Sequence, residues 1–310
     1  MTVAIMDLGT NTFHLLIAKV EKHDLQILYK SKIAVKLGEN GISAHRISAK
    51  PFKRGVSAMK RFGKIAAFYQ PEKIIAVGTA AIRNALNKKE FLNAIEKESG
   101  IRVKVISGIR EAQLIYEGAR QAIRIGSGKT LIMDIGGGSV EFIIADGKKI
   151  FCKHSFELGA ALLLEQFKPD DPLKPAQLKK IRKYLGETLQ PLFDACEKYQ
   201  PDSLTGSSGS FDTFAEMISY RFYKPGILRN ATTYEFKMED YYAIYNLLLF
   251  STTAERTKMK GLIAMRIDMI VIAAIILTFV LEKLNIKKMK LSTYALKEGV
   301  LYKLINNKPI

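Results

Sequence analysis

The chain has 310 residues, about twice the length of a typical domain, which excludes a single small module and favours two domains. Hydrophobic residues make up 48% and charged residues 25%, with nine prolines, and this composition excludes an intrinsically disordered protein. The formal net charge is +18, from 48 Lys and Arg against 30 Asp and Glu. This excess predicts a polyanionic partner, whether nucleic acid, polyphosphate or a nucleotide.

The sequence shows neither a recognisable secretion signal nor an apolar run long enough to span a membrane. The longest apolar run, Met269 to Leu281, is too short to cross a bilayer and lies among charged residues, so it predicts a buried helix. The first residues lack the basic region and cleavage site of a signal peptide. Two cysteines are too few for a disulfide framework, and no Cys/His cluster has metal-ligand spacing. We therefore expect a cytoplasmic protein without a membrane partner.

The chain begins with a short apolar strand that ends at Asp7, turns through a Gly-containing loop, and returns as the strand Phe13 to Val20. The pattern recurs once: residues 5–12 (IMDLGTNT) align without gaps with residues 132–139 (IMDIGGGS), and a strand again follows. A single loop of this kind is an ordinary β-hairpin turn. Its duplication predicts two facing loops that bind phosphate through backbone N–H groups and hydroxyls, with the preceding Asp holding a cation.

A basic stretch follows the first hairpin. Between Glu39 and Glu72 the chain has no acidic residue, and all the charges are positive: Arg46, Lys50, Lys53, Arg54, Lys60, Arg61 and Lys64. Two interpretations stay open, a solvated helix face or a track that binds a long polyanion.

The region between the two loops alternates between strands and helices, which favours a layered α/β domain. The expected elements are a strand at 73–77, a helix at 89–98, a strand at 102–107 and a helix at 111–122. After Pro169 the pattern is mostly helical, with helices near 175–197, 211–219, 239–251 and 253–284, a polar turn at 206–210, a strand at 287–292 and a closing helix at 294–305.

Five segments occur in an order that is typical of one family: DLGTNT at 7–12, GTAAIR at 78–83, ISGIREA at 106–112, DIGGGSVE at 134–141 and LKEG at 296–299. Together they resemble the exopolyphosphatase / guanosine pentaphosphate phosphohydrolase family of the actin, sugar kinase and Hsp70 ATPase superfamily, in its short form without the C-terminal HD-like region. The resemblance implies an α/β fold of two ribonuclease-H-like (actin-like) lobes with the active site in the cleft between them. It places the first lobe at 1–116 and the second at 117–293, with a helix at about 294–310 packing back across the junction.

The resemblance also implies roles for individual residues. Glu111 would be the general base and Glu141 a second catalytic carboxylate, while Asp7, Asp134 and Glu141 would hold Mg²⁺ or Mn²⁺. Without the resemblance, the residues favour the acid of a helix first turn for Glu111, and they leave open an exposed arginine at a helix start for Arg83. Phosphate would be bound by Gly9, Thr10, Asn11, Thr12, Arg83, Gly136, Gly137, Gly138 and Ser139.

Four positions break the pattern. In the internal repeat Glu141 aligns with His14, so the second copy carries a carboxylate where the first has a histidine, to which we assign a structural role. Arg110 stands where the family usually has Glu, and we expect it either to depress the pKa of Glu111 or to contact substrate. Leu162 replaces a usual arginine and removes one phosphate contact, and Lys297 stands where Arg is usual.

Three functions follow, in order of preference. The first is an exopolyphosphatase that hydrolyses the terminal phosphate of inorganic polyphosphate by metal-assisted, in-line attack of water. The second is a phosphohydrolase of guanosine pentaphosphate or nucleoside triphosphates, or a kinase-like ATPase, because the turn at 206–210 lies where nucleotide-binding members of the superfamily contact adenosine. The third is a non-catalytic polyanion-binding protein, which the clustered carboxylates disfavour. Nucleic acid is not expected as a partner, and a homodimer is left open.

Overall fold

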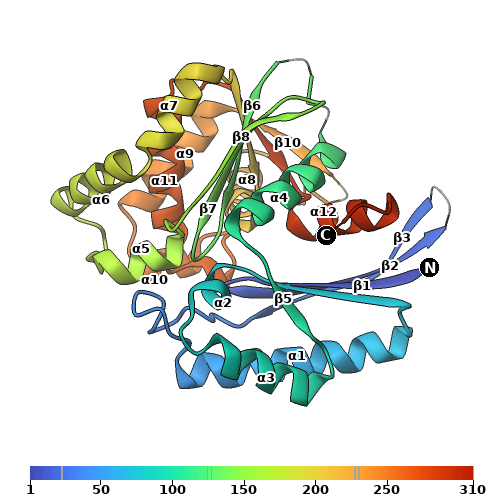
Figure 1. Cartoon of the computed structure of the whole chain (residues 1–310). Helices are drawn as coiled ribbons and strands as arrows, with labels where there is room; N and C mark the ends of the chain where they lie inside the picture. The colour runs from blue at the N-terminus through green and yellow to red at the C-terminus, as the bar shows by residue number, and fades with distance from the viewer. Residues whose placement is uncertain (22–23, 124, 127, 227, 230, 310) are drawn as a thin grey trace.

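The computed structural model describes all of the chain except residues 22–23, 124, 127, 227, 230 and 310, and it has two lobes, each built on a mixed β-sheet (Figure 1). The first sheet has the strand order β3-β2-β1-β4-β5, and helices α1 and α3 cover its outer face. The bounds in this part are β1 (Thr2–Leu8), β2 (Thr12–Glu21), β3 (Asp24–Ala34), α1 (Ala49–Tyr69), β4 (Lys73–Gly78), α2 (Ala80–Asn84), α3 (Lys88–Ser99), β5 (Val103–Val105) and α4 (Gly108–Ala122).

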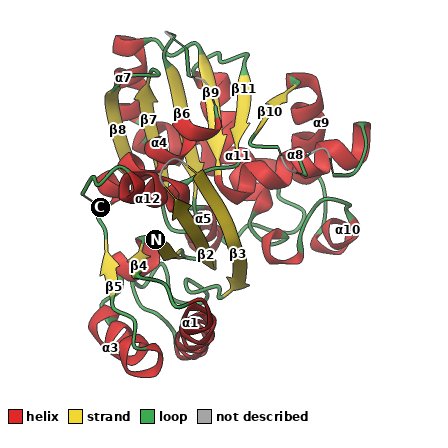
Figure 2. Ribbon diagram, turned by 90° about the vertical axis from the view of Figure 1, so that its right-hand side faces the viewer, coloured by secondary structure: helices red, strands yellow, loops and turns green. Residues whose placement is uncertain are grey.

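The second sheet has the order β10-β11-β9-β6-β7-β8, which Figure 2 shows running across the upper lobe. The bounds are β6 (Thr130–Ile135), β7 (Val140–Ala145), β8 (Ile150–Phe156), α5 (Ala160–Phe167), α6 (Pro175–Thr188), α7 (Gln190–Tyr199), β9 (Ser203–Ser207), α8 (Ser208–Phe222), β10 (Thr233–Phe236), α9 (Met238–Leu249), α10 (Thr253–Lys258), a 3₁₀ turn (Ala264–Arg266), α11 (Ile270–Lys283), β11 (Met289–Ser292) and α12 (Leu296–Ile305).

The repeat in the sequence is confirmed as a repeat of topology. Strand β1 pairs with β2 antiparallel and with β4 parallel, and β6 pairs with β7 antiparallel and with β9 parallel. The registers also agree, because Asp7 lies opposite His14 and Asp134 lies opposite Glu141. The expected α/β fold of two actin-like lobes is therefore confirmed.

A separate hydrophobic core joins the two lobes. Helices α4 and α12 lie between the sheets (Figure 1), and their buried side chains pack with Val3 and Ile5 of the first sheet and Ile132 and Ile143 of the second. The helices cross at two glycines. A Cβ atom on Gly118 would overlap the carbonyl of Ala295, and one on Gly299 would overlap the carbonyl of Leu114. The close approach of these backbones fixes the position of α4, which carries Glu111.

The run that predicted a buried helix forms α11, whose residues from Ile270 to Leu277 are all buried. The expectation that this helix begins at Thr253 is wrong. Helix α10 ends at Lys258, and Gly261 adopts a φ of +83°, a left-handed conformation that ends helical progress. Within the part of the chain that the structure describes, no helix combines the length and apolarity that a membrane crossing requires.

Three further expectations are corrected. The helix expected at 175–197 is broken at Leu189 into α6 and α7, where Pro191 occupies the start of the second helix. The segment Gly206 to Ser210 is not a free turn, because it completes β9 and opens α8. The strand expected at 102–107 forms only over Val103–Val105.

Candidate active site

The two repeated hairpin loops face each other across the lobes. Each is closed by the same bond: Gly9 N–H donates to the Thr12 carbonyl at 3.1 Å, and Gly136 N–H donates to the Ser139 carbonyl at 3.0 Å. A Cβ atom on Gly137 would lie 2.6 Å from Asn11 Nδ2, so the loops touch and the second loop has no room for side chains at its tip.

A cavity of about 160 Å³ opens between the lobes beside these loops. Most of the residues expected at the site line it, and they come from both lobes. They are Asp7, Gly9, Thr10, Asn11, Thr12, Glu111, Asp134, Gly136, Gly137, Gly138 and Ser139. Arg83 and Glu141 do not line it and lie behind its wall, where Arg83 pairs with Glu111 and Glu141 accepts a hydrogen bond from the Ser139 side chain.

Glu111 enters the cavity from the first turn of α4. Ser107 caps this helix by accepting the N–H of Arg110, and Glu111 N–H donates to the Ser107 carbonyl. The Glu111 carboxylate receives Arg83 Nη1 at 2.8 Å, and the same nitrogen donates to the Ile106 carbonyl at 3.1 Å. Burial raises the pKa of Glu111 to about 7, although Arg83 opposes the rise. The carboxylate is thus held in place and titrates near neutrality, as a general base requires.

One aspartate lies near the end of the first strand of each hairpin, Asp7 in β1 and Asp134 in β6. Burial, together with the negative charges of Glu111 and Asp134, raises the pKa of Asp7 to about 7. Burial also raises the pKa of Asp134, which is opposed by hydrogen bonds from Ser207 Oγ at 2.8 Å and Ser208 Oγ at 2.6 Å. The segment that looked like a polar turn therefore serves to orient Asp134.

Glu141 is only 1% exposed. Its carboxylate accepts Ser155 Oγ at 2.7 Å, and burial, with the charges of Glu111 and Asp134, raises its pKa well above the usual value. Glu141 is therefore a buried carboxyl group that lies behind the second loop and does not line the cavity.

Several charged residues that were not among the expected site residues also line the cavity. The cations are Lys32, Arg266 and Lys297, and Asp212 lies with them. Lys297, noted only as a departure from the family pattern, pairs with Glu298 Oε1 at 3.1 Å and lowers the pKa of both Asp7 and Asp134. Lysine in place of the usual arginine at position 297 therefore keeps a positive charge in the cavity.

His14, for which we expect a structural role, also lines the cavity. Burial, together with the positive charges of Lys297, Lys32 and Arg266, lowers its pKa to about 3. His14 is neutral at physiological pH and adds no positive charge to the cavity.

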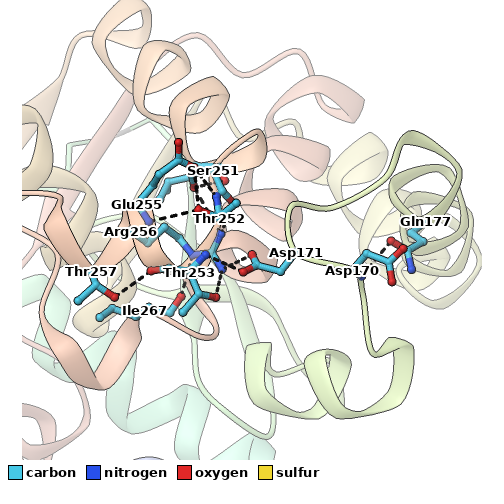
Figure 3. A network of polar contacts seen from close by, with 11 residues as sticks. Asp170, Asp171, Gln177, Ser251, Thr252, Thr253, Glu255, Arg256, Thr257 and Ile267 are labelled. Carbon is cyan, nitrogen blue, oxygen red and sulfur yellow. Dashed lines mark hydrogen bonds and ion pairs between the residues drawn. The ribbon is translucent and has the colours of Figure 1, made fainter.

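A segment of the second lobe packs directly on the first loop. Asn11 Nδ2 contacts Met269 Sδ at 2.9 Å, and Lys36 Nζ pairs with Asp268 Oδ2 at 2.8 Å. Behind this segment, the buried Arg256 donates to the Ile267 carbonyl at 3.1 Å and to Asp171 Oδ1 at 2.9 Å (Figure 3). The polar network of Figure 3 thereby fixes the segment that carries Arg266 to the cavity.

The cavity suits a divalent cation that takes two carboxylates from the protein and its other ligands from water and substrate. Over the described residues, no three Asp, Glu, His or Cys side chains are grouped as a metal site. Mg²⁺ commonly takes one or two carboxylates and completes its shell with water and substrate phosphates. Asp7 and Asp134 line the cavity and offer such oxygen ligands, and burial, which raises the pKa of both, disfavours their ionised forms, which a cation would stabilise. Glu141 lies behind them.

Arg110 does not act on Glu111 as expected. The pKa of Glu111 is raised, not depressed, and the cation that lowers it is Arg83. Arg110 Nη2 instead donates to the Pro309 carbonyl at 2.6 Å, so its guanidinium is held by the end of the chain.

Comparison with known proteins agrees with this arrangement. A Haemophilus influenzae protein that carries an exopolyphosphatase name is 30% identical over 98% of this chain and 92% of its own length. Exopolyphosphatase 1 of Mycobacterium tuberculosis is 25% identical, over 99% of this chain and 89% of its own. The crystal structure of an exopolyphosphatase from Cytophaga hutchinsonii superposes with a TM-score of 0.97 at 37% identity, over 100% of this chain and 99% of that one. The Ppx/GppA phosphatase family matches residues 16–308. The chain therefore belongs to the Ppx/GppA phosphatase family and is a phosphoanhydride hydrolase.

Proposed function

We propose that this enzyme is an exopolyphosphatase that removes the terminal phosphate of inorganic polyphosphate. One observation carries the proposal: the carboxylate of Glu111, fixed by Arg83 and titrating near neutrality, enters the same cavity as two touching glycine loops. The names of the relatives from Cytophaga hutchinsonii and Mycobacterium tuberculosis support the choice of substrate.

Each group would then have a distinct role. The N–H groups of the loops and the side chains of Thr10 and Ser139 bind the terminal phosphoryl group, and Lys297 and Arg266 stabilise its charge. Glu111 accepts the proton of a water molecule whose oxygen forms the new bond to phosphorus. The bridging P–O bond breaks, and its electrons leave with the shortened chain. Binding of a polyanion beside the carboxylates requires the cations that line the cavity.

Asp7 and Asp134 would hold Mg²⁺ or Mn²⁺, which when bound neutralises charge on the phosphoryl oxygens. We expect thorough chelation to abolish phosphate release and added Mg²⁺ or Mn²⁺ to restore it. As a readout apart from turnover, Mg²⁺ titrated by calorimetry should bind the wild type and bind Asp134→Asn more weakly. Full activity after chelation would contradict this assignment.

A second candidate, hydrolysis of guanosine pentaphosphate or a nucleoside triphosphate, is favoured by a neighbouring cavity. It has a volume of about 600 Å³ and shares Lys32, Gly209, Asp212, Arg266 and Thr293 with the first. Tyr220, Leu262 and Ile263 give it an apolar wall that a base could contact.

The deciding experiment compares phosphate release from long polyphosphate, tripolyphosphate, guanosine pentaphosphate and ATP. Our proposal expects the highest kcat/KM for polyphosphate. A preference for guanosine pentaphosphate or ATP would favour the second candidate, and binding of polyphosphate without any phosphate release would favour a non-catalytic protein.

A further inference from the structure

The end of the chain closes onto the start of the catalytic helix. After α12 the backbone turns back, and Lys308 N–H donates to the Lys303 carbonyl at 2.8 Å. The carbonyl oxygen of Pro309 then receives two cations, Arg110 Nη2 at 2.6 Å and Lys303 Nζ at 3.1 Å. One neutral oxygen atom thus accepts hydrogen bonds from two positive groups.

Further positive charges act on Lys303, one of the two groups that bind this oxygen. Lys303 is 7% exposed, and its pKa is lowered first by burial and then by Arg110, Lys308 and Lys153. The carboxylate that acts on Lys303 in the opposite sense is Glu117, which Arg120 also approaches at 3.7 Å. An anion at the position of the carbonyl oxygen would be stabilised by the two cations that bind it, Arg110 and Lys303.

Two members of the cluster, Arg110 and Lys153, are close in sequence to residues of the candidate active site. Arg110 immediately precedes Glu111 in the first turn of α4. Lys153 lies on β8 two residues before Ser155, whose hydroxyl binds Glu141, and its Nζ donates to Gln113 Oε1 on α4 at 2.9 Å, one turn after Arg110. A linear substrate whose terminal phosphate lies at Glu111 could therefore continue past this cluster.

We propose that Arg110, Lys153 and Lys303 form a phosphate-binding subsite outside the cavity, which takes an internal phosphate of a long polyphosphate chain, and that the Pro309 carbonyl competes for it. The proposal rests on the function proposed above, because it needs a substrate with more phosphates than the cavity holds. Its chemistry is that of phosphate oxygens on a guanidinium and two ammonium groups, which free orthophosphate shares.

Two changes of opposite effect test the competition. Deleting residues 306–310 leaves α12 intact and releases Arg110 and Lys303, so KM for long polyphosphate should fall about three- to tenfold. Arg110→Gln should raise the same KM by a similar factor, and Arg110→Lys should restore part of the loss. In both cases KM for tripolyphosphate should change less. Arg102→Gln is the matched control, because Arg102 is an exposed arginine of the same lobe that pairs with Glu96.

Binding separates this inference from the proposed function. With metal chelated to prevent turnover, calorimetry with long polyphosphate should show weaker binding to Arg110→Gln and tighter binding to the deletion variant. No phosphate release by the wild type would overturn the proposed function and leave this binding result standing. Long-chain KM and binding within twofold of wild type in both variants would overturn the subsite. If inhibition by orthophosphate changes but long-chain KM does not, the subsite takes free phosphate and the chain proposal is wrong. Lys153→Gln repeats the test if Arg110→Gln does not fold, as judged by its melting temperature.

Discussion

Arg83 Nη1 lies 2.8 Å from Glu111 Oε2, and both side chains are largely buried beside the cavity. The pair forms because β4 and β5 are parallel neighbours, so the segments that follow them meet at one edge of the sheet. Arg83 lies on α2 after β4, and Glu111 lies in the first turn of α4 after β5. The arginine expected to contact phosphate is thus also the group that orients the expected base.

We expect Glu111→Gln to lower kcat by about 10²–10⁴, since general-base catalysis contributes about 3–5 kcal/mol to the barrier. Polyphosphate binding should survive or tighten, because one negative charge leaves the cavity. Kinetics and calorimetry on the same variant check both parts. Glu90→Gln is the control, since Glu90 is the exposed acid in the first turn of α3. If Glu111 served only as a helix-terminal acid, both variants would lose under about 1 kcal/mol of stability and keep wild-type kcat.

The pH dependence should report the same carboxylate. The pKa of Glu111 is raised to about 7 by burial, so the fraction of active base grows as pH rises through this value, and kcat/KM should rise with it. Arg83 lowers this pKa, and its removal must raise it further. The acidic limb of Arg83→Gln should therefore lie at higher pH than that of the wild type. An unchanged limb in this variant would show that another group controls the rise.

The local features of the site could be predicted from the sequence, and the long-range ones could not. A glycine hairpin is specified by adjacent residues, so the sequence predicts where the two loops form, and Asp7 and Asp134 line the cavity beside them. Lys32 and Arg266 reach the cavity from a strand of the first sheet and from the turn before α11, and nothing in their local pattern marks them. Their proximity arises only when the lobes pack. The prediction of one continuous helix at 253–284 was wrong for a related reason, since hydrophobic periodicity does not reveal a single left-handed glycine such as Gly261.

The basic stretch after the first hairpin forms part of α1, and its cations are not equivalent. Arg54 donates to the carbonyls of Val35 and Lys36 and binds Glu39, and Lys60 pairs with Glu98. Arg54→Ala should therefore lower the free energy of unfolding by about 1–3 kcal/mol, measured by urea denaturation, because two carbonyls lose a charged donor.

A polyanion track must instead depend on the exposed cations Lys50, Lys53, Arg61 and Lys64. Changing all four to Gln should raise KM for long polyphosphate more than KM for tripolyphosphate and flatten the salt dependence of the former. Equal changes for both substrates would identify the stretch as a solvated helix face.

The crossing of α4 and α12 gives a test of the junction between the lobes. Alanine is the better helix former by about 1 kcal/mol, so Gly→Ala in a helix stabilises where there is space. Gly186, near the end of α6, has that space, because an added Cβ would lie 3.5 Å from Phe279 Cζ in ordinary contact. A Cβ on Gly299 would overlap the Leu114 carbonyl and push α12 from α4.

Gly186→Ala should therefore leave stability unchanged or raise it by up to about 1 kcal/mol. Gly299→Ala should lower it by about 1–3 kcal/mol through overpacking, and it should also reduce kcat, because Glu111 is carried by the displaced helix. Urea denaturation and kcat measured on both variants separate helix propensity from packing. If Gly299→Ala is as stable and as active as Gly186→Ala, the close approach of the two helices does not position the base.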